Sequence, residues 1–108
     1  MALTAALITA SATSVYTSNG NNAITCMTIC NYSGTATTLT LYAVPSTSGG
    51  TVVGTASSTN ILISALTIPG GETVTLDQEK LVLGNNDSIQ ALAGATSRLN
   101  IVISTLPV

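Results

Sequence analysis

Short runs of alternating apolar and polar residues recur along the chain and are separated by clusters of Gly, Asn, Pro and Ser. This period-two alternation indicates half-buried strands, and the clusters between them are typical of turns. The pattern predicts strands at residues 3–9, 13–17, 23–31, 35–44, 51–54, 60–68, 73–76, 81–83, 88–93 and 99–106. The segment 60–68, NILISALTI, is apolar enough to predict a strand buried on both faces.

Eight to ten short strands with no helical period between them predict an all-β fold. We expect a single antiparallel β-sandwich over residues 1–108, either jelly-roll or immunoglobulin-like. The chain contains no Phe and no Trp, so its core should consist of Leu, Ile, Val and Ala. In the first twelve residues, Leu3, Ala5 and Leu7 share one face of a strand, which predicts an N-terminal arm or an edge strand at 1–12.

Charge is scarce in this sequence. Charged residues make up 6% of the 108 residues, against roughly 25% in an ordinary soluble domain, and histidine is absent. A net charge of −2 provides no basic surface for nucleic acid or for an anionic membrane, and no apolar run approaches the length of a membrane helix. Because a nearly uncharged surface allows copies to approach each other, we expect a homo-oligomeric subunit of an assembly. A monomer coated with threonine is the alternative.

Cys26 and Cys30 are the only cysteines. Residues four apart on a strand share a face with Cα atoms ~13 Å apart, whereas a disulfide needs Cα atoms within about 7 Å. They would meet only in a helix, and AITCMTICN has no helical stripe. A zinc site would need ligands that the chain lacks nearby. The favoured interpretation is two buried thiols that pack as small apolar side chains, with an intermolecular disulfide as the alternative.

Candidate catalytic groups are also few. Asp77, Glu79 and Lys80 fall in one bend, which is explained by a solvated turn as well as by a carboxylate pair. The segment GNND at 84–87 offers oxygens for Ca²⁺ through Asp87, yet it lacks the EF-hand spacing and is a favoured β-turn sequence. The sequence therefore predicts no catalytic, cofactor-binding or metal-binding residues, and no enzyme.

Contact with a protein partner is the function that remains. The candidate contact residues are Leu3, Leu7, Tyr42, Ser46, Thr47 and Ser48. Tyr42 alternates with inward positions of its strand, so its ring should face outward. The other five lie in the N-terminal strand and in the loop PSTSGG at 45–50. An ordinary edge strand and an ordinary hairpin loop are the alternatives for these segments.

Three segments in order, VYTSNGNNAITCMTICNYSGTATTLTLYAVP, LTIPGGETVTL and LVLGNNDSIQALA, resemble small virion structural proteins of tailed bacteriophages, including marine cyanophages. The resemblance covers residues 15–103 and consists of strands and turns. The chain departs from it in GNND, where the family pattern has a simpler Gly-Asp turn.

The resemblance implies a protein of the phage particle, made in the host cytoplasm, with no catalytic residues. Its partners would be the major capsid protein or other virion proteins, and it would be a homo-oligomer, for example a trimer. We expect a capsid decoration or cement protein that binds and stabilises the assembled shell. The alternatives are a neck or tail component and a receptor-recognition module of a tail fibre.

Overall fold

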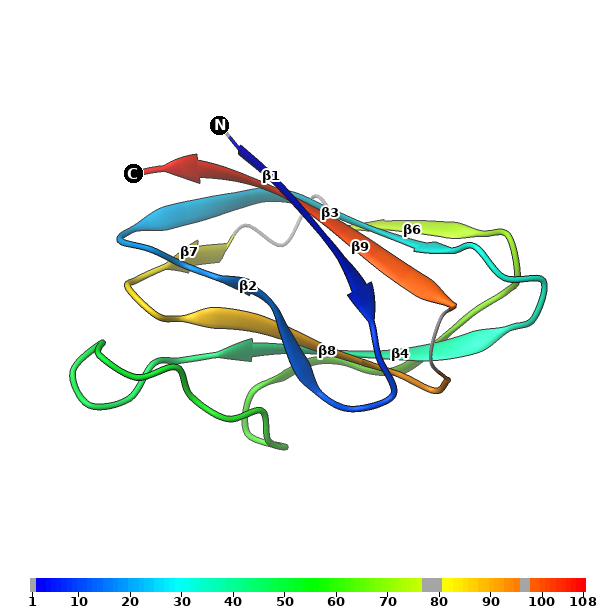
Figure 1. Ribbon diagram of the computed structural model, residues 1–108, viewed down its shortest axis with the longest axis horizontal. Coiled ribbons are helices and arrows are strands. Elements are labelled where there is room, and N and C mark those ends of the chain that lie inside the picture. The colour runs from blue at the N-terminus through cyan, green and yellow to red at the C-terminus, as the bar shows by residue number, and fades with distance from the viewer. Residues whose placement is uncertain (1, 77–80, 96–97) are drawn as a thin grey trace.

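A computed structural model describes residues 2–76, 81–95 and 98–108, and these form nine strands and no helix (Figure 1). The strands are β1 (Ala2–Ile8), β2 (Thr13–Thr17), β3 (Asn22–Asn31), β4 (Thr37–Val44), β5 (Ile61–Ile68), β6 (Thr73–Leu76), β7 (Leu81–Leu83), β8 (Ser88–Ala93) and β9 (Leu99–Pro107). The all-β prediction and the expected number of strands are confirmed. The charged bend expected at 77–80 lies outside the described residues.

The strands form two antiparallel sheets that pack face to face (Figure 1). Sheet A has the order β1-β9-β3-β6, and β7 pairs with the other half of β3. Sheet B has the order β2-β8-β4-β5. The pairs β1–β9, β2–β8, β3–β6/β7 and β4–β5 are nested inside one another along the chain. This nesting, divided between two sheets, is the topology of a jelly roll.

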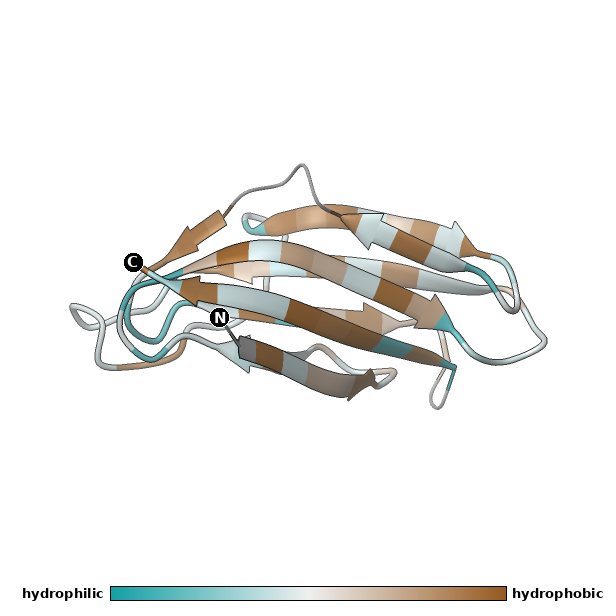
Figure 2. Cartoon of the chain, turned by 90° about the horizontal axis from the view of Figure 1, so that it is seen from above, coloured by the Kyte–Doolittle hydropathy of each residue, from teal (hydrophilic) through white to brown (hydrophobic). Residues whose placement is uncertain are grey.

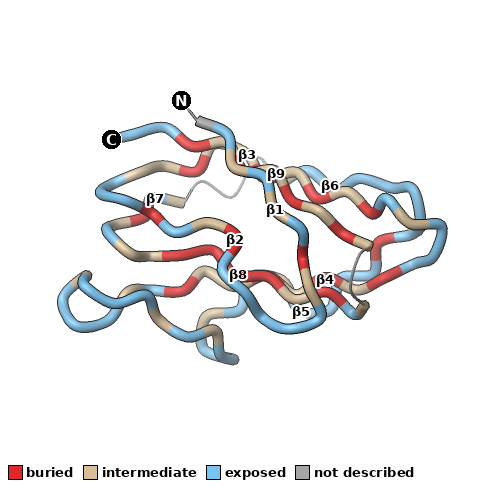
Figure 3. The backbone as a smooth tube through the Cα atoms, viewed as in Figure 1, coloured by how far each residue is buried: buried red, intermediate tan, exposed pale blue. Residues whose placement is uncertain are grey.

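The core lies between the two sheets and is built by alternation. Along β9, Leu99, Ile101 and Ile103 are fully buried, and they face β3 residues such as Ile29 and Met27. Figure 3 shows the same alternation of buried and partly exposed positions along β4 and β9. Leu39 and Leu41 of β4 supply the facing surface from sheet B. Aliphatic side chains thus fill the core without any Phe or Trp.

The outer faces of the two sheets differ. The long connection from Pro45 to Asn60 folds back over sheet B, where Gln90 donates its side-chain N–H to the Gly54 carbonyl at 3.1 Å. Ser88 and Gln90 point to this outer face and are nevertheless buried. On sheet A, the outward residues of β1, β3 and β9 remain exposed or half-buried.

Two predictions about strands were wrong. β5 is the edge strand of sheet B and is largely exposed, because only β4 pairs with it and its outer side faces solvent. Residues 51–54 form no strand of the sheets, because this segment closes a small hairpin through an isolated bridge between Thr47 and Val52.

Candidate partner-binding surface

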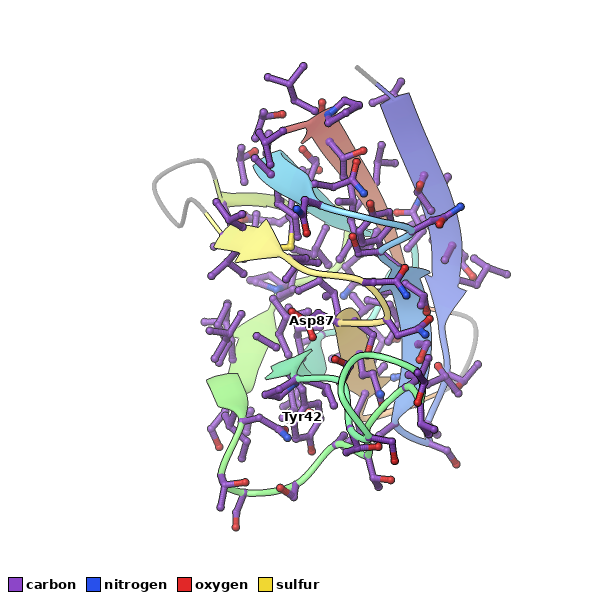
Figure 4. All side chains as sticks on the ribbon, turned by 90° about the vertical axis from the view of Figure 1, so that its left-hand side faces the viewer. Tyr42 and Asp87 are labelled. Carbon is purple, nitrogen blue, oxygen red and sulfur yellow. The ribbon has the colours of Figure 1, made fainter. Side chains whose placement is uncertain are left out.

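Asp87 joins three loops at one end of the sandwich (Figure 4). Its Oδ1 accepts the Ser46 backbone N–H at 2.7 Å, and its Oδ2 accepts the Gly84 N–H at 2.9 Å. The Asp87 carbonyl accepts the Ser18 N–H at 2.9 Å. One residue thus ties the turn 84–87 to the loop after β4 and to the loop after β2.

We call this set of hydrogen bonds the Asp87 clamp, and neighbouring asparagines add further bonds to it. Asn85 accepts the Gly20 N–H at 2.9 Å, and Asn85 and Asn86 each donate to the Gly50 carbonyl at 3.1 Å. Asn86 has a φ of 63°, a left-handed conformation that Asn tolerates better than most residues. The side chains of Asn85, Asn86 and Asp87 thus form hydrogen bonds within the chain, as the turn interpretation of GNND expects.

The electrostatics of Asp87 follow from these bonds. Partial burial alone would raise its pKa, but the N–H groups of Ser46 and Gly84 and the Ser46 side chain outweigh burial, so the pKa is lowered from its ordinary value. Hydrogen bonds that donate to the charged form stabilise it. The carboxylate is therefore the form that holds the clamp.

The predicted contact loop 46–50 is shaped by this clamp. Ser46 is held by Asp87, and the Thr47 carbonyl accepts the N–H groups of Gly50 and Val52. Ser48 has a φ of 54°, in the left-handed region. Thr47 and Ser48 are exposed at the tip, so the loop presents a fixed and accessible hairpin.

The other predicted contact residues lie elsewhere. Tyr42 is half-buried on the outer face of sheet B, opposite Gln90 (Figure 4). Leu3 and Leu7 of β1 point outward on sheet A, where they are 75% and 61% exposed. The structure therefore does not bring the six candidates into one site. They belong to three surfaces: the outer face of sheet A, the outer face of sheet B, and the loop end.

The expectation that both thiols are buried was wrong. Cys26 and Cys30 lie on the outer face of sheet A, and both are only half-buried. A bulge between Ile24 and Cys26 shifts the register of β3 against β9, so Ile24 faces the core and Cys26 faces outward. Both cysteines are free thiols. Their position leaves them open to a partner rather than to the core.

Asn31 was not singled out from the sequence, although it organises the opposite end of the sandwich. Its buried side chain donates to the carbonyls of Thr35 and Ile68, both at 2.9 Å. Its Oδ1 accepts the N–H and the hydroxyl of Ser33. No signal in the sequence points to this role, because the Ile68 carbonyl is 37 residues away along the chain.

The sandwich also has an apolar cavity of about 230 Å³ between β5 and β6. Its lining side chains are Met27, Leu41, Leu62, Ile63 and Leu76. Small-molecule sites usually measure about 300–1,000 Å³ and contain a few polar groups that orient the ligand. This cavity is smaller, and its lining is aliphatic, so it fits a single apolar side chain better than a substrate.

Within the described residues, no three His, Cys, Asp or Glu side chains come close enough to hold a metal ion. The same residues contain no helix of the length and hydropathy needed to span a bilayer. The expectation that the chain is not an enzyme stays a prediction.

Comparison with known proteins gives a likeness of fold. No family model and no curated protein matches the chain. Among solved structures, it is similar to a chain from the Bacillus endospore appendages, which form a novel family of disulfide-linked pili. The TM-score is 0.50 and the sequence identity 16%, over 99% of this chain and 84% of the other. At this identity the likeness shows the fold alone, a sandwich also found in a bacterial appendage.

Proposed function

We propose that this chain is a non-enzymatic structural protein of a tailed-phage virion, and that it acts as a capsid decoration or cement protein. The assignment to a phage particle is supported by the sequence resemblance described above. The structural role is supported by the nearly uncharged surface and by an edge strand suited to contact with other subunits.

The main support for a structural role is that β1 is an unprotected edge strand. It lies at the end of sheet A and pairs with β9 in unbroken register from Ala2 to Ile8. Natural edge strands are usually protected by charges, Pro, bulges or short length. β1, ALTAALI, has seven residues and none of these devices. Such an edge is expected where another subunit covers it.

Binding to the assembled shell, and not to its separate subunits, would stabilise the shell by mass action. A stable interface needs about 800 Å² on each partner, and the whole surface of this chain measures 5360 Å². The exposed hairpin at Thr47 and Ser48 and the free side of β1 lie on different surfaces, so they would contact different neighbouring subunits of the shell. We propose the major capsid protein as the partner, with copies of this chain arranged as a homo-oligomer.

The number of copies per particle tests the proposal. Trypsin cleaves the chain after Lys80 and Arg98, which releases LVLGNNDSIQALAGATSR as a reporter for quantitative mass spectrometry of purified virions. Abundance comparable with the major capsid protein is the expected result. A few copies per particle would reassign the chain to the neck, tail or tail fibre. Complete absence from virions would overturn the proposal.

The contact itself is tested with purified protein and particles. We expect Thr47→Glu to weaken binding at least about tenfold, because a charge buried in an interface loses its hydration. Ser58→Glu is the matched control, since Ser58 is exposed in a different part of the 45–60 connection. Equal binding by both variants would exclude the loop tip. Stronger binding to host cells than to particles would favour receptor recognition.

A second candidate function is a subunit of a disulfide-linked filament. It is favoured by two observations: the fold likeness to a chain of disulfide-linked pili and the outward position of Cys26 and Cys30. In an oxidising compartment, two thiols on different copies would form one disulfide, releasing two protons and passing two electrons to an oxidant such as molecular oxygen. This candidate predicts a ladder of oligomers on non-reducing electrophoresis that collapses with a thiol reductant. In Ser14→Cys controls, the ladder should persist when Cys26 and Cys30 are kept and should be lost when they are removed.

A further inference from the structure

The outer face of sheet A is a broad surface that no other part of the described chain covers. Four outward rows cross its strands, and the central row contains Ala5, Val102, Thr28 and Thr75. The next row on one side contains Leu3, Ser104 and Cys26, and the row on the other side contains Leu7, Asn100, Cys30 and Thr73. Figure 2 looks down on this face.

One corner of the face is strongly apolar. Leu106 of β9 and Val82 of β7 both flank Ala23 of β3, and they are 44% and 69% exposed. Leu3, at 75%, lies diagonally beside Leu106 on β1. Contiguous exposed apolar side chains of this kind mark interaction surfaces in soluble proteins.

The same face is free of charge within the described residues. Glu72, Asp87 and Arg98 are the charged residues that the structure describes, and each lies in a connection outside the strands of sheet A. An antiparallel sheet that faces water usually presents polar and charged side chains outward. Here the outward positions of β3 and β9 are Ala, Cys, Thr, Val, Ser, Asn and Leu.

Sheet B shows what a covered face looks like in this protein. Its outer residues Ser88 and Gln90 are buried under the chain's own 45–60 connection. The described residues provide no such cover over sheet A. Its outward side chains at the centre of the face, such as Val102 and Thr28, are therefore available to another molecule.

We propose that the outer face of sheet A binds the same face of a second copy, forming a two-fold symmetric dimer. The described residues of this face carry no charge, so they can meet their own copies without like-charge repulsion, which is the condition for a self-complementary contact. The whole molecule, loops included, measures 41 × 27 × 20 Å, and sheet A lies across its longest and shortest axes (Figures 1 and 2). A rectangle of 41 × 20 Å, about 820 Å², is therefore the upper limit of the face in projection. A standard interface needs about 800 Å² per partner, so the contact must use most of the face.

The geometry of such a dimer also fixes the state of the thiols. Sheets packed face to face lie about 10 Å apart, whereas a disulfide needs Cα atoms within about 7 Å. Cys26 and Cys30 would therefore be shielded in the dimer and would remain thiols. This distinguishes the proposed contact from a disulfide-linked one, and it does not depend on the assignment to a virion.

Charges placed at the centre of the face provide the test. Thr28 lies between Val102 and Thr75 on this face, so Thr28→Lys brings one positive charge from each copy into the contact. Like charges closer than one Debye length, ~8 Å, repel each other. In sedimentation equilibrium we expect wild type to be dimeric and Thr28→Lys to raise the dissociation constant at least about a hundredfold. Ser14→Lys is the matched control, because Ser14 is exposed on the outer face of sheet B; it should leave the constant unchanged.

Two further measurements separate loss of contact from loss of folding. Thr28→Glu alone should also be monomeric, and an equimolar mixture of Thr28→Glu and Thr28→Lys should recover the dimer, which an unfolded variant would not do. Alkylation of Cys26 and Cys30 by a bulky maleimide should slow with rising protein concentration in wild type and stay constant in Thr28→Lys. A monomeric wild type, equal effects of the Thr28 and Ser14 variants, or a mixture that stays monomeric would each overturn the proposal.

Discussion

The Asp87 clamp gives the most direct test of how the contact loop is held. Replacing Asp87 by Asn exchanges one carboxylate oxygen for an NH2 group and keeps the size of the side chain. The carboxylate accepts N–H groups with both oxygens, from Ser46 at 2.7 Å and from Gly84 at 2.9 Å. An amide can accept only one of them, and its own N–H group then faces the other donor. The variant therefore loses one bond and weakens the second.

The magnitude follows from the type of bond. A hydrogen bond to a charged group contributes about 1.5–3 kcal/mol, against about 0.5–1.5 kcal/mol for a neutral pair. Since the site is only partly buried, water replaces some of the loss, and we expect Asp87→Asn to lower the free energy of unfolding by about 2 kcal/mol. With a typical urea slope of about 1–3 kcal/mol/M, the unfolding midpoint should fall by about 1 M.

The dependence on pH has a definite sign. The folded pKa of Asp87 lies below its ordinary value, so the carboxylate contributes stability above the unfolded pKa, and this contribution is lost as the pH falls through the folded pKa. Wild type should therefore lose stability relative to Asp87→Asn below about pH 4, and the two urea midpoints should converge in acid.

Urea unfolding at pH 7 and in acid measures both effects, and amide exchange reports the loop itself. The Ser46 and Gly84 amides should exchange faster in Asp87→Asn, while the Asn31 amide, bonded to the Glu72 carbonyl at the other end, should not change. Glu72→Gln is the control for removing an exposed carboxylate and should shift stability by less than about 0.5 kcal/mol. If Asp87→Asn behaves like Glu72→Gln at pH 7, the carboxylate does not hold the loop.

Three further predictions concern the packing of the sandwich. A Cβ on Gly70 would lie 2.5 Å from the Gly34 backbone carbon, so Gly70→Ala should cost about 1–3 kcal/mol, whereas Gly34→Ala, with open space around its Cβ, should be nearly neutral in the same thermal unfolding assay. Leu76 lines the 230 Å³ cavity, so Leu76→Phe should fill it and raise the free energy of unfolding by about 0.5–2 kcal/mol; a lower urea midpoint would show that the cavity is not available to the ring. Because Cys26 and Cys30 face outward, the double serine variant should change the free energy of unfolding by less than about 1 kcal/mol. A loss of several kcal/mol would show that the thiols are part of the core.

Most of the strands could be predicted from the sequence because alternation determines them locally. In β9, the apolar Leu99, Ile101 and Ile103 alternate with Asn100 and Val102, and these three apolar residues are fully buried. The distinction between jelly roll and immunoglobulin-like topology could not be predicted, because the pairing of β1 with β9 joins opposite ends of the chain. Strand spacing contains no information about such distant partners.

Two errors have local physical causes. The apolar run of β5 shows that the segment is hydrophobic, but it does not show whether other strands cover it. Its place at the edge of sheet B leaves Leu62 and Leu66 exposed. In β3, Ile24 and Cys26 have the same parity in sequence, and only the bulge at Thr25 separates their faces. A bulge changes which side every later residue faces, so one irregularity reversed the expected environment of both thiols.

The candidate contact residues were predicted individually but not as surfaces. Leu3, Leu7, Thr47 and Ser48 are exposed, as a contact requires, and their role in binding a partner stays a prediction. The Asp87 clamp could not be predicted from the sequence, because the bond between Asp87 and Ser46 spans 41 residues.

The nested pairing of the strands has a consequence for synthesis on the ribosome. β4 and β5 are neighbours in sequence and can pair early, but β3 must wait for β6, β2 for β8, and β1 for β9. At about 5–20 residues per second, β1 leaves the ribosome several seconds before its partner exists. During that interval β1, whose side chains carry no charge, has no neighbour within its own sheet, because β9 is the only strand that pairs with it among the described strands.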